Sequence, residues 1–315
     1  MTDAATAIAA AAQRCSNVGR WGPDDVLGTL NHITETDRVA AARLITRGRA
    51  FSLSLPYSAD GPQRGWRRRT NPVHTMLDTG LDAEHGNQGF PHGIGGADDV
   101  IAMPLQCSTH WDGLGHIFDH GRAWNGRRAG EVVTSEGDAL TGIETVRGLI
   151  TGRGVLLDVG RVVGDGELPD GFAITEQHLL DTADAHGVEV KRGDLLCVRT
   201  GRLTRTRSEG WGEYAGGPSP GLSFSTLDWL HRTEIAGVAT DTWGCEVRPN
   251  EFDDAFQPLH QVAIPHIGLF LGEMWDLDEL AGDCAADGVY TFWLTAAPIP
   301  VTGAVGAPVN PVAVK

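Results

Sequence analysis

The amino-acid sequence predicts an α/β fold with a mixed β-sheet core and flanking helices. Short apolar runs beside glycine, at residues 154–159 and 194–199, are typical of buried strands. Between them, residues 175–186 show the apolar spacing of a helix and are followed by Gly187. Because no repeat or long linker interrupts the chain, we expect residues 1–315 to form a single domain.

The other elements follow from the same kinds of signal. Thr36 and Asp37 precede an apolar periodicity that ends before Gly48, which predicts a first helix. Alternation of apolar residues after Ala50 predicts a strand. In chain order we expect a helix at 37–46, a strand at 50–56, a long irregular surface segment at 61–96, a strand at 100–105, a helix at 225–232 with Ser225 as a possible cap, a strand at 235–240, and terminal strands and turns at 289–314.

The charge balance excludes one class of partner. The chain has 25 Lys and Arg against 41 Asp and Glu, a net charge of −16. Binding to a phosphate backbone needs clustered Lys and Arg, so we expect no nucleic-acid partner. The five cysteines are scattered and form no CxxC pair, which fits a reducing compartment. No run approaches the roughly 18 apolar residues of a membrane span, and the Ala-rich start lacks a signal-peptide pattern, so we expect a cytoplasmic protein without membrane contact.

The strongest chemical signal lies between Gln106 and His116. His110 and Asp112 follow a predicted strand and lie two residues apart, so their side chains share one face of an extended segment. An imidazole nitrogen and a carboxylate oxygen on one face are suitable ligands for Zn²⁺ or Mn²⁺. The glycines that follow let the chain turn, which would return His116 to the same point as a general base. The alternative is that these groups only hydrogen-bond within a turn.

Three further segments each admit two interpretations. An apolar run delivers Glu273 after a glycine, and His260 precedes that run; either both belong to a site, or they are a helix-start carboxylate and a packed core histidine. The polar residues at 241–246 follow a predicted strand and form either a pocket lining or an ordinary turn. The basic segment 66–69 is either a contact for an anionic substrate or a solvated loop, and the loop is preferred.

Taken together, these motifs resemble the cyclase family of metal-dependent hydrolases, which includes bacterial kynurenine formamidase and isatin hydrolase. The family motif His-x-Gly-Thr-His-x-Asp-x-Pro-x-His aligns with residues 106–116, and residues 20–28, 152–158, 193–201 and 259–273 match other family segments in the same order. The resemblance implies a swivelling β/β/α fold and a homo-oligomer, a dimer or a tetramer. It implies that His110 and Asp112 are metal ligands, that His116 is the general base or acid, and that His260 and Glu273 complete the site.

Three positions depart from the family motif. Gln106 stands where the family has its first histidine and offers a neutral carbonyl oxygen, a harder and weaker ligand than imidazole. This favours one divalent ion, Mn²⁺ or Zn²⁺, over two. Ser108 replaces the family glycine and Leu114 replaces the family proline, which changes the turn that orients His116.

From these residues we expect a hydrolase that opens an amide, imide or lactone bond of a small molecule, in the manner of an arylformamidase. Trp111, Phe118 and Trp243 are candidates for an aromatic wall against a flat substrate, with His74 as a further candidate for the pocket wall; core packing is the alternative for the aromatic residues. Two other functions stay open, a cyclase or lyase of secondary metabolism that uses the same metal site, and a non-catalytic binding protein.

Overall fold

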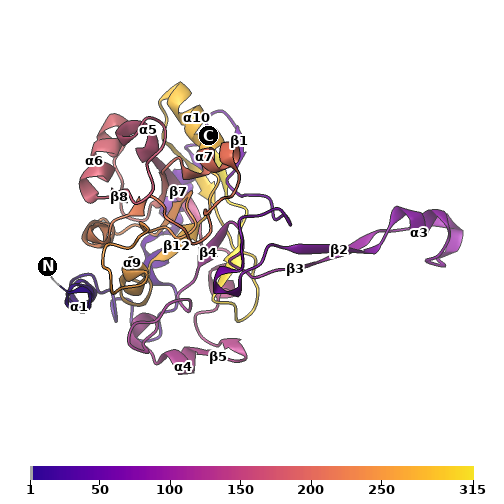
Figure 1. The fold of residues 1–315 in the computed structure, drawn as a ribbon, viewed down its shortest axis with the longest axis horizontal. Coiled ribbons are helices and arrows are strands. Elements are labelled where there is room, and N and C mark those ends of the chain that lie inside the picture. The colour runs from indigo at the N-terminus through magenta and orange to yellow at the C-terminus, as the bar shows by residue number, and fades with distance from the viewer. Residues whose placement is uncertain (1–2) are drawn as a thin grey trace.

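A mixed sheet forms the centre of the computed structural model, which describes residues 3–315 (Figure 1). Its strands lie in the order β1-β15-β13-β7-β9-β11-β12-β4-β14; the four strands β7, β9, β11 and β12 are parallel and the remaining pairs are antiparallel. The nine strands are β1 (Ala50–Ser52), β4 (His110–Asp112), β7 (Thr151–Asp158), β9 (Leu195–Arg199), β11 (Gly237–Thr240), β12 (Phe270–Glu273), β13 (Thr291–Thr295), β14 (Gly306–Pro308) and β15 (Val312–Val314).

Helices and three small two-stranded sheets surround this core. The helices are α1 (Ala4–Arg14), α2 (Glu35–Ala42), α3 (Gly80–Glu84), α4 (Ala129–Val132), α5 (Val159–Val163), α6 (Glu176–Ala185), α7 (Arg202–Glu209), α8 (Leu227–Arg232), α9 (Pro258–Val262) and α10 (Asp278–Asp287). The small sheets pair β2 (Val73–Asp78) with β3 (Asp98–Ala102), β5 (Val133–Thr134) with β6 (Gly137–Asp138), and β8 (Ala173–Ile174) with β10 (Gly221–Leu222).

The sheet buries a different apolar cluster on each face, because side chains alternate along a strand. On β7, Val155 and Leu157 join the cluster that packs under α1, α6, α8 and α9. Leu156 faces the other way, into a cluster with Trp111 and Trp275. The predicted mixed sheet with helices on its faces is therefore confirmed. Within residues 3–315, no helix combines the length and the apolar character needed to cross a membrane.

Most predicted elements are present, with shifted ends. The first helix begins at Glu35 because Thr34 and Asp37 form a reciprocal capping box, two residues earlier than predicted. Before α8, Ser223 rather than Ser225 caps the chain, since its hydroxyl accepts the Ser225 N–H. The predicted strand at 50–56 is confined to its first three residues in β1.

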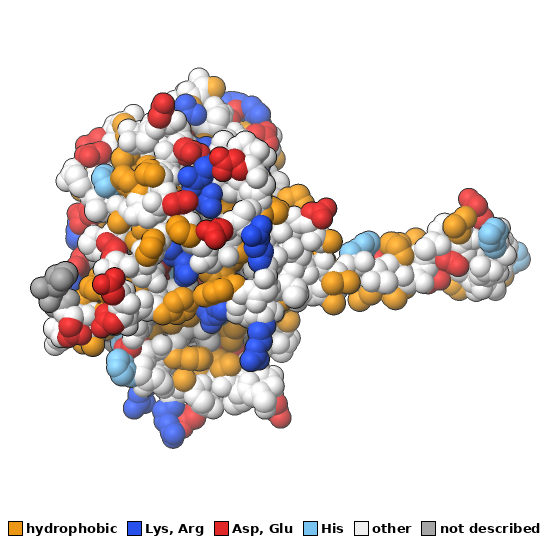
Figure 2. All heavy atoms as spheres, in the orientation of Figure 1, with side chains coloured by type: hydrophobic (Ala, Val, Ile, Leu, Met, Phe, Trp, Pro, Cys, Tyr) orange, Lys and Arg blue, Asp and Glu red, His pale blue; other side chains and the backbone are white. Residues whose placement is uncertain are grey.

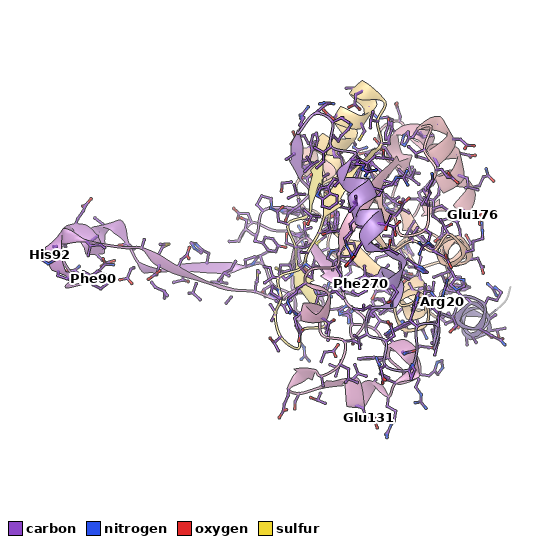
Figure 3. The ribbon with its side chains drawn as sticks, turned by 180° about the vertical axis from the view of Figure 1, so that it is seen from behind. Arg20, Phe90, His92, Glu131, Glu176 and Phe270 are labelled. Carbon is purple, nitrogen blue, oxygen red and sulfur yellow. The ribbon has the colours of Figure 1, made fainter. Side chains whose placement is uncertain are left out.

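The prediction of an irregular surface segment at 61–96 is wrong for its second half, from residue 73 onward. Residues 73–102, which we call the arm, contain β2, α3 and β3 and extend as a hairpin away from the body (Figure 1). Phe90 and His92 lie at its far end (Figure 3). The strand predicted at 100–105 is the end of this hairpin, so it does not run directly into His110. Local apolar runs cannot distinguish a hairpin strand from a core strand, and that is the reason for the error.

Gly154 offers a test of how closely the sheet is packed. A Cβ at this position would lie 2.2 Å from Cε2 of Phe292, which is fully buried on the neighbouring strand. We expect Gly154→Ala to lower the free energy of unfolding by about 1–3 kcal/mol, because the ring must move in a filled core. Urea denaturation measures the change. Gly148→Ala is the matched control, since nothing lies within 4 Å of its added methyl group; equal losses in the two variants would contradict the packing argument.

Candidate metal centre

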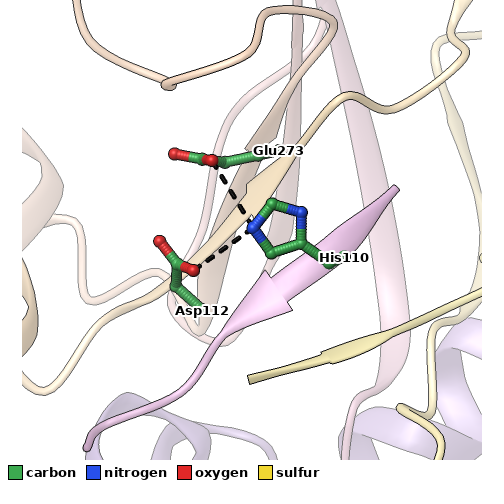
Figure 4. Close-up of side chains that lie close together, drawn as sticks. All are labelled: His110, Asp112 and Glu273. Carbon is green, nitrogen blue, oxygen red and sulfur yellow. Dashed lines mark ion pairs between the residues drawn. The ribbon is translucent and has the colours of Figure 1, made fainter. Parts of the chain in front are cut away.

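Three buried side chains converge on one point between β4 and β12 (Figure 4). The Nε2 atom of His110 lies 3.3 Å from Oδ1 of Asp112 and 3.5 Å from Oε2 of Glu273. His110 and Asp112 share a face because they alternate on β4, as predicted. Glu273 is added by register, since β12 pairs antiparallel with β4 and sets Glu273 directly opposite His110.

Two atoms of this cluster have no hydrogen-bond partner among residues 3–315. Nδ1 of His110 donates to the carbonyl oxygen of Ser108 at 2.8 Å, so Nε2 presents its lone pair to the cluster. Both this Nε2 and Oδ1 of Asp112 are buried and unpartnered. Buried polar atoms in proteins are normally satisfied. A nitrogen lone pair and carboxylate oxygens, all within 4.8 Å of one another, form a donor set that fits Zn²⁺ or Mn²⁺.

His116 borders the same point from the side of the solvent. Its Nε2 lies 3.5 Å from Oδ1 of Asp112, and its side chain is 10% exposed. The intervening glycines are needed for close approach: a Cβ on Gly113 would lie 2.8 Å from the carbonyl oxygen of Val305, and one on Gly115 would lie 2.1 Å from Oδ2 of Asp138. The turn predicted from these glycines is present, and it depends on steric room.

A second pair of residues, His260 on α9 and Glu246 in the loop after β11, supports the cluster. Oε1 of Glu273 accepts a hydrogen bond from Nε2 of His260 at 3.1 Å, and the other ring nitrogen of His260 is bonded to Glu246. Glu246 also accepts the backbone N–H groups of Leu259 and His260, at 3.2 and 3.1 Å. One carboxylate thus fixes both the start of α9 and the orientation of the His260 ring.

The buried charges around this point are mutually compensating. Burial alone would lower the pKa of His260, but hydrogen bonds to Glu246 and Glu273 outweigh it and raise the pKa to about 10. Burial opposes ionisation of Asp112, yet the adjacent His116 and His110 hold the pKa of that carboxyl well below its usual range. Burial lowers the pKa of His116 to about 4 against the opposing effect of Asp112, so this ring is a neutral base at pH 7.

The structure brings three of the five predicted ligands into one cluster and places the other two beside it. His110, Asp112 and Glu273 form the cluster, while His260 lies beside it with both ring nitrogens directed at carboxylates, so it positions Glu273 instead of joining the three donors. Gln106 lies over Gly306, the residue opposite Asp112; its Nε2 is 3.1 Å from where a Cβ on Gly306 would stand. The lack of a side chain at Gly306 leaves room for the Gln106 amide beside the cluster.

The structure places two of the predicted substrate contacts away from this centre. Trp111 alternates with His110 and Asp112, so it points to the opposite face of β4, where its Nε1 donates to the carbonyl oxygen of Ala296 at 2.9 Å. His74 lies on the exposed arm and is paired with Asp99 at 2.8 Å, away from this centre of its own chain.

The other two aromatic candidates lie near the centre. Phe118 is 38% exposed and lines a cleft of about 320 Å³ together with His116, Arg67, Phe256, Gln257 and Gln261. Trp243 is buried in a cluster with Met274, the residue after Glu273. Its Nε1 has no partner in the described part of the chain.

Sequence reasoning left one important residue undecided. Glu246 belongs to the segment 241–246, for which a pocket lining and a plain turn were both open, and the structure makes it the partner of His260. Asp241 in the same segment is structural, because its carboxylate accepts the backbone N–H groups of Thr200 and Gly201 at 2.8 and 2.9 Å. Nothing in the spacing of the segment distinguishes the two acids.

Comparisons with known proteins give a consistent result. The family model "Cyclase" matches residues 51–247. A solved structure described as a novel cyclase is 40% identical, with a TM-score of 0.88 over 95% of this chain and 99% of that one. Isatin hydrolase A from Ralstonia solanacearum is similar in fold at 16% identity (TM-score 0.64, covering 90% and 98%). So is a "predicted metal-dependent hydrolase" from Bacillus stearothermophilus, at 16% identity (TM-score 0.52, covering 85% and 98%). No curated protein matches the chain.

Metal binding tests the three-donor cluster directly. We expect the purified protein to bind Mn²⁺ or Zn²⁺, and His110→Ala and Glu273→Ala to lose that binding because each removes a donor. A saturating ion at about 100 times its Kd stabilises the folded state by about 2.7 kcal/mol. Elemental analysis and thermal melts with and without added metal measure both effects. His74→Ala on the exposed arm is the control; metal-induced stabilisation that persists in both cluster variants would show that the ion binds elsewhere.

Proposed function

The chain belongs to the cyclase family, and from that premise we propose that it is a metal-dependent hydrolase that opens an amide, imide or lactone bond. The observation that supports this most is the buried donor set of His110, Asp112 and Glu273, with a neutral histidine at its open side. Structures of similar fold include proteins described as an isatin hydrolase and a metal-dependent hydrolase, and we extend the same reaction class to this chain.

Each residue of the site has a separate task in this proposal. A divalent ion held by His110, Asp112 and Glu273 would supply Lewis acidity toward a carbonyl group and toward water. His116 accepts the proton of the attacking water at Nε2 and donates it to the leaving nitrogen or oxygen. Asp112, 3.5 Å from that nitrogen, favours the protonated ring that forms in between. His260 and Glu246 keep Glu273 from rotating out of the cluster.

Substrate reaches the site through the cleft beside His116. Phe118 and Phe256 provide apolar surface on this cleft, and Gln257 and Gln261 provide amide groups. A cleft of about 320 Å³ suits a small molecule with one ring. Aromatic amides and formamides are therefore the substrates that we would test first.

Replacement of His116 separates catalysis from metal binding. We expect His116→Gln to lower kcat by about 10²–10⁴-fold, the usual contribution of a general base, while metal content stays unchanged. The assay is a panel of formamides, cyclic imides and lactones, with product mass recorded. Hydrolysis adds one water to the product; a product of unchanged mass would replace hydrolysis by cyclisation. His120→Gln is a matched control, because His120 is exposed and hydrogen-bonded to Asp119.

We further propose that the arm docks on a second copy of this chain. Eight of its large apolar residues are 44–69% exposed, and a lone two-stranded hairpin is marginal in water. Figure 2 shows apolar side chains along the length of the arm. The exposed apolar residues are Val73, Met76, Leu77, Leu81, Phe90, Ile94, Val100 and Ile101.

Size and charge favour a second copy as the partner. A standard interface uses about 20–30 residues on each side, and residues 73–102 are a segment of that length. The arm has acidic residues at 78, 82, 84, 98 and 99 and no Lys or Arg. Near its base, the exposed Arg64 and Arg68 have no carboxylate partner among residues 3–315. Acidic and basic surfaces on one chain can pair twice across a two-fold axis.

The oligomeric state tests the role of the arm. We expect the protein to form a dimer or a larger assembly, and a variant with Leu77→Asp, Leu81→Asp and Ile94→Asp to be a folded monomer, because each charge falls on exposed apolar surface. Size-exclusion chromatography with light scattering gives the mass, and circular dichroism checks folding. Val39→Asp, 55% exposed on α2, is the control. A monomeric unmodified protein, or an assembly that survives the triple substitution, would contradict the proposal.

A further inference from the structure

We propose that Arg69 and Arg248, with the rings of Trp66, Trp243 and Phe256, form an anion subsite that binds a carboxylate group on an aromatic substrate. We call these five residues the arginine subsite. It rests on the proposed function only in assigning the anion to the substrate of the metal centre; the ability to bind an aromatic carboxylate stands on its own.

Arg69 is the first observation. Arg69 is only 7% exposed, yet its guanidinium has no hydrogen-bond or ion-pair partner in the described part of the chain. The guanidinium makes a cation–π contact with the face of Trp243, at 5.4 Å from Cζ to the ring centroid. Arginine is rarely buried without a carboxylate, because removing the charge from water is costly. A missing anion is the simplest completion of such a site.

Arg248 repeats the pattern from a different loop. Its Nη2 donates to the carbonyl oxygen of Gly216 at 2.8 Å, but Nε and Nη1 are buried and unpartnered within residues 3–315. Burial lowers the pKa of its guanidinium, against the opposing charges of Glu246 and Glu273. Nε and Nη1 are therefore two free donors on one charged group, and charge-assisted hydrogen bonds from a guanidinium to carboxylate oxygens are among the strong ones.

Both arginines lie toward the metal centre. Each contacts the ring of Trp243, at 5.4 Å for Arg69 and 6.0 Å for Arg248, and Trp243 packs with Met274, the residue after Glu273. The nearby acids cannot serve as partners of Arg248, because Glu246 is bonded to His260 and the start of α9, and Glu273 is bonded to His260 and belongs to the metal cluster. The arginines therefore add positive charge that no carboxylate among residues 3–315 pairs with at short range.

The surrounding rings indicate the shape of the ligand. Trp66 and Trp243 meet edge to face at 4.8 Å between centroids, and Phe256 lies 5.7 Å from Trp66. Arg248 lies 5.4 Å from the Trp66 centroid and 5.8 Å from that of Phe256, so the cation and the apolar surface are adjacent. A flat ring that bears a carboxylate satisfies both. The basic segment 66–69, which we preferred to interpret as a solvated loop, is here a substrate contact.

Binding of benzoate, with uncharged benzyl alcohol as its counterpart, tests the arginine subsite. The experiment uses the His110→Ala protein in the presence of a chelator, so that benzoate cannot bind a metal ion. Charge-assisted hydrogen bonds of this kind change affinity by about 10- to 100-fold. We expect benzoate to bind at least tenfold more tightly than benzyl alcohol, and Arg69→Gln and Arg248→Gln each to weaken benzoate by about that factor. Quenching of tryptophan fluorescence reports binding, since two indole rings line the subsite.

Matched variants decide the interpretation. Arg43→Gln, at an exposed position after α2, is expected to leave benzoate binding unchanged. Arg69→Lys keeps the charge without the planar fork, so intermediate affinity is expected, and thermal melts show whether each variant folds. Equal affinity for benzoate and benzyl alcohol in the parent protein, or benzoate binding that persists in the folded double variant of Arg69 and Arg248, would overturn the proposal.

An activity assay on the metal-loaded protein tests whether the arginine subsite binds the substrate of the reaction. Formanilide and its 2-carboxy derivative differ only in the carboxylate, and we expect Arg69→Gln to lower kcat/KM for the carboxylated compound by about tenfold more than for the other. Arginine-dependent benzoate binding in a protein that hydrolyses no amide, imide or lactone of the panel would overturn the hydrolase and support the subsite. Hydrolysis with the same loss of kcat/KM for both compounds would overturn the subsite and support the hydrolase.

Discussion

The antiparallel register of β4 and β12 is the constraint on which the metal centre depends. It sets His110 directly opposite Glu273, so a donor from residue 273 meets two donors from a strand more than 160 positions away. A shift of one residue would send Glu273 to the other face of the sheet, where Trp111 packs in the core. β4 has only three residues, but it is paired on both sides, with β12 and with β14. The packed sheet, and not the acids themselves, holds these charges in a dry interior.

Electrostatic compensation explains how several acids occupy this interior together. His260 lies between Glu246 and Glu273 and is protonated there, so it offsets part of the negative charge that burial makes costly. The same ring connects three segments, since Glu246 comes from the loop after β11, His260 from α9, and Glu273 from β12. The position of α9 is consequently coupled to the position of the Glu273 carboxylate. Asp112 and His116 therefore lie opposite a carboxylate whose orientation is fixed.

Outside the metal centre, one local region has a charge of opposite sign to the net charge of the chain. The chain has a net charge of −16, yet the loop with Arg64–Arg69 and the residue Arg248 form a basic region next to the cleft. Such a local contrast raises the concentration of anions at the mouth of a site. The acidic arm is the complementary surface. In an assembly where the arm of one copy covers the basic loop of another, substrate access and oligomer formation involve neighbouring parts of the same face.

Local patterns in the sequence determined those features that depend on a few adjacent residues. The alternation of a strand brought His110 and Asp112 to one face, and the capped apolar periods and glycine-flanked runs located most helices and core strands within a few residues. Tertiary structure alone decided which distant groups meet them. Strand register set Glu273 opposite His110, the start of α9 made Glu246 the partner of His260, and the outward path of the arm placed His74 away from the centre of its own chain. These outcomes depend on pairing and packing between segments far apart in the chain, where the energies that select one arrangement belong to the whole sheet and to no single stretch of sequence.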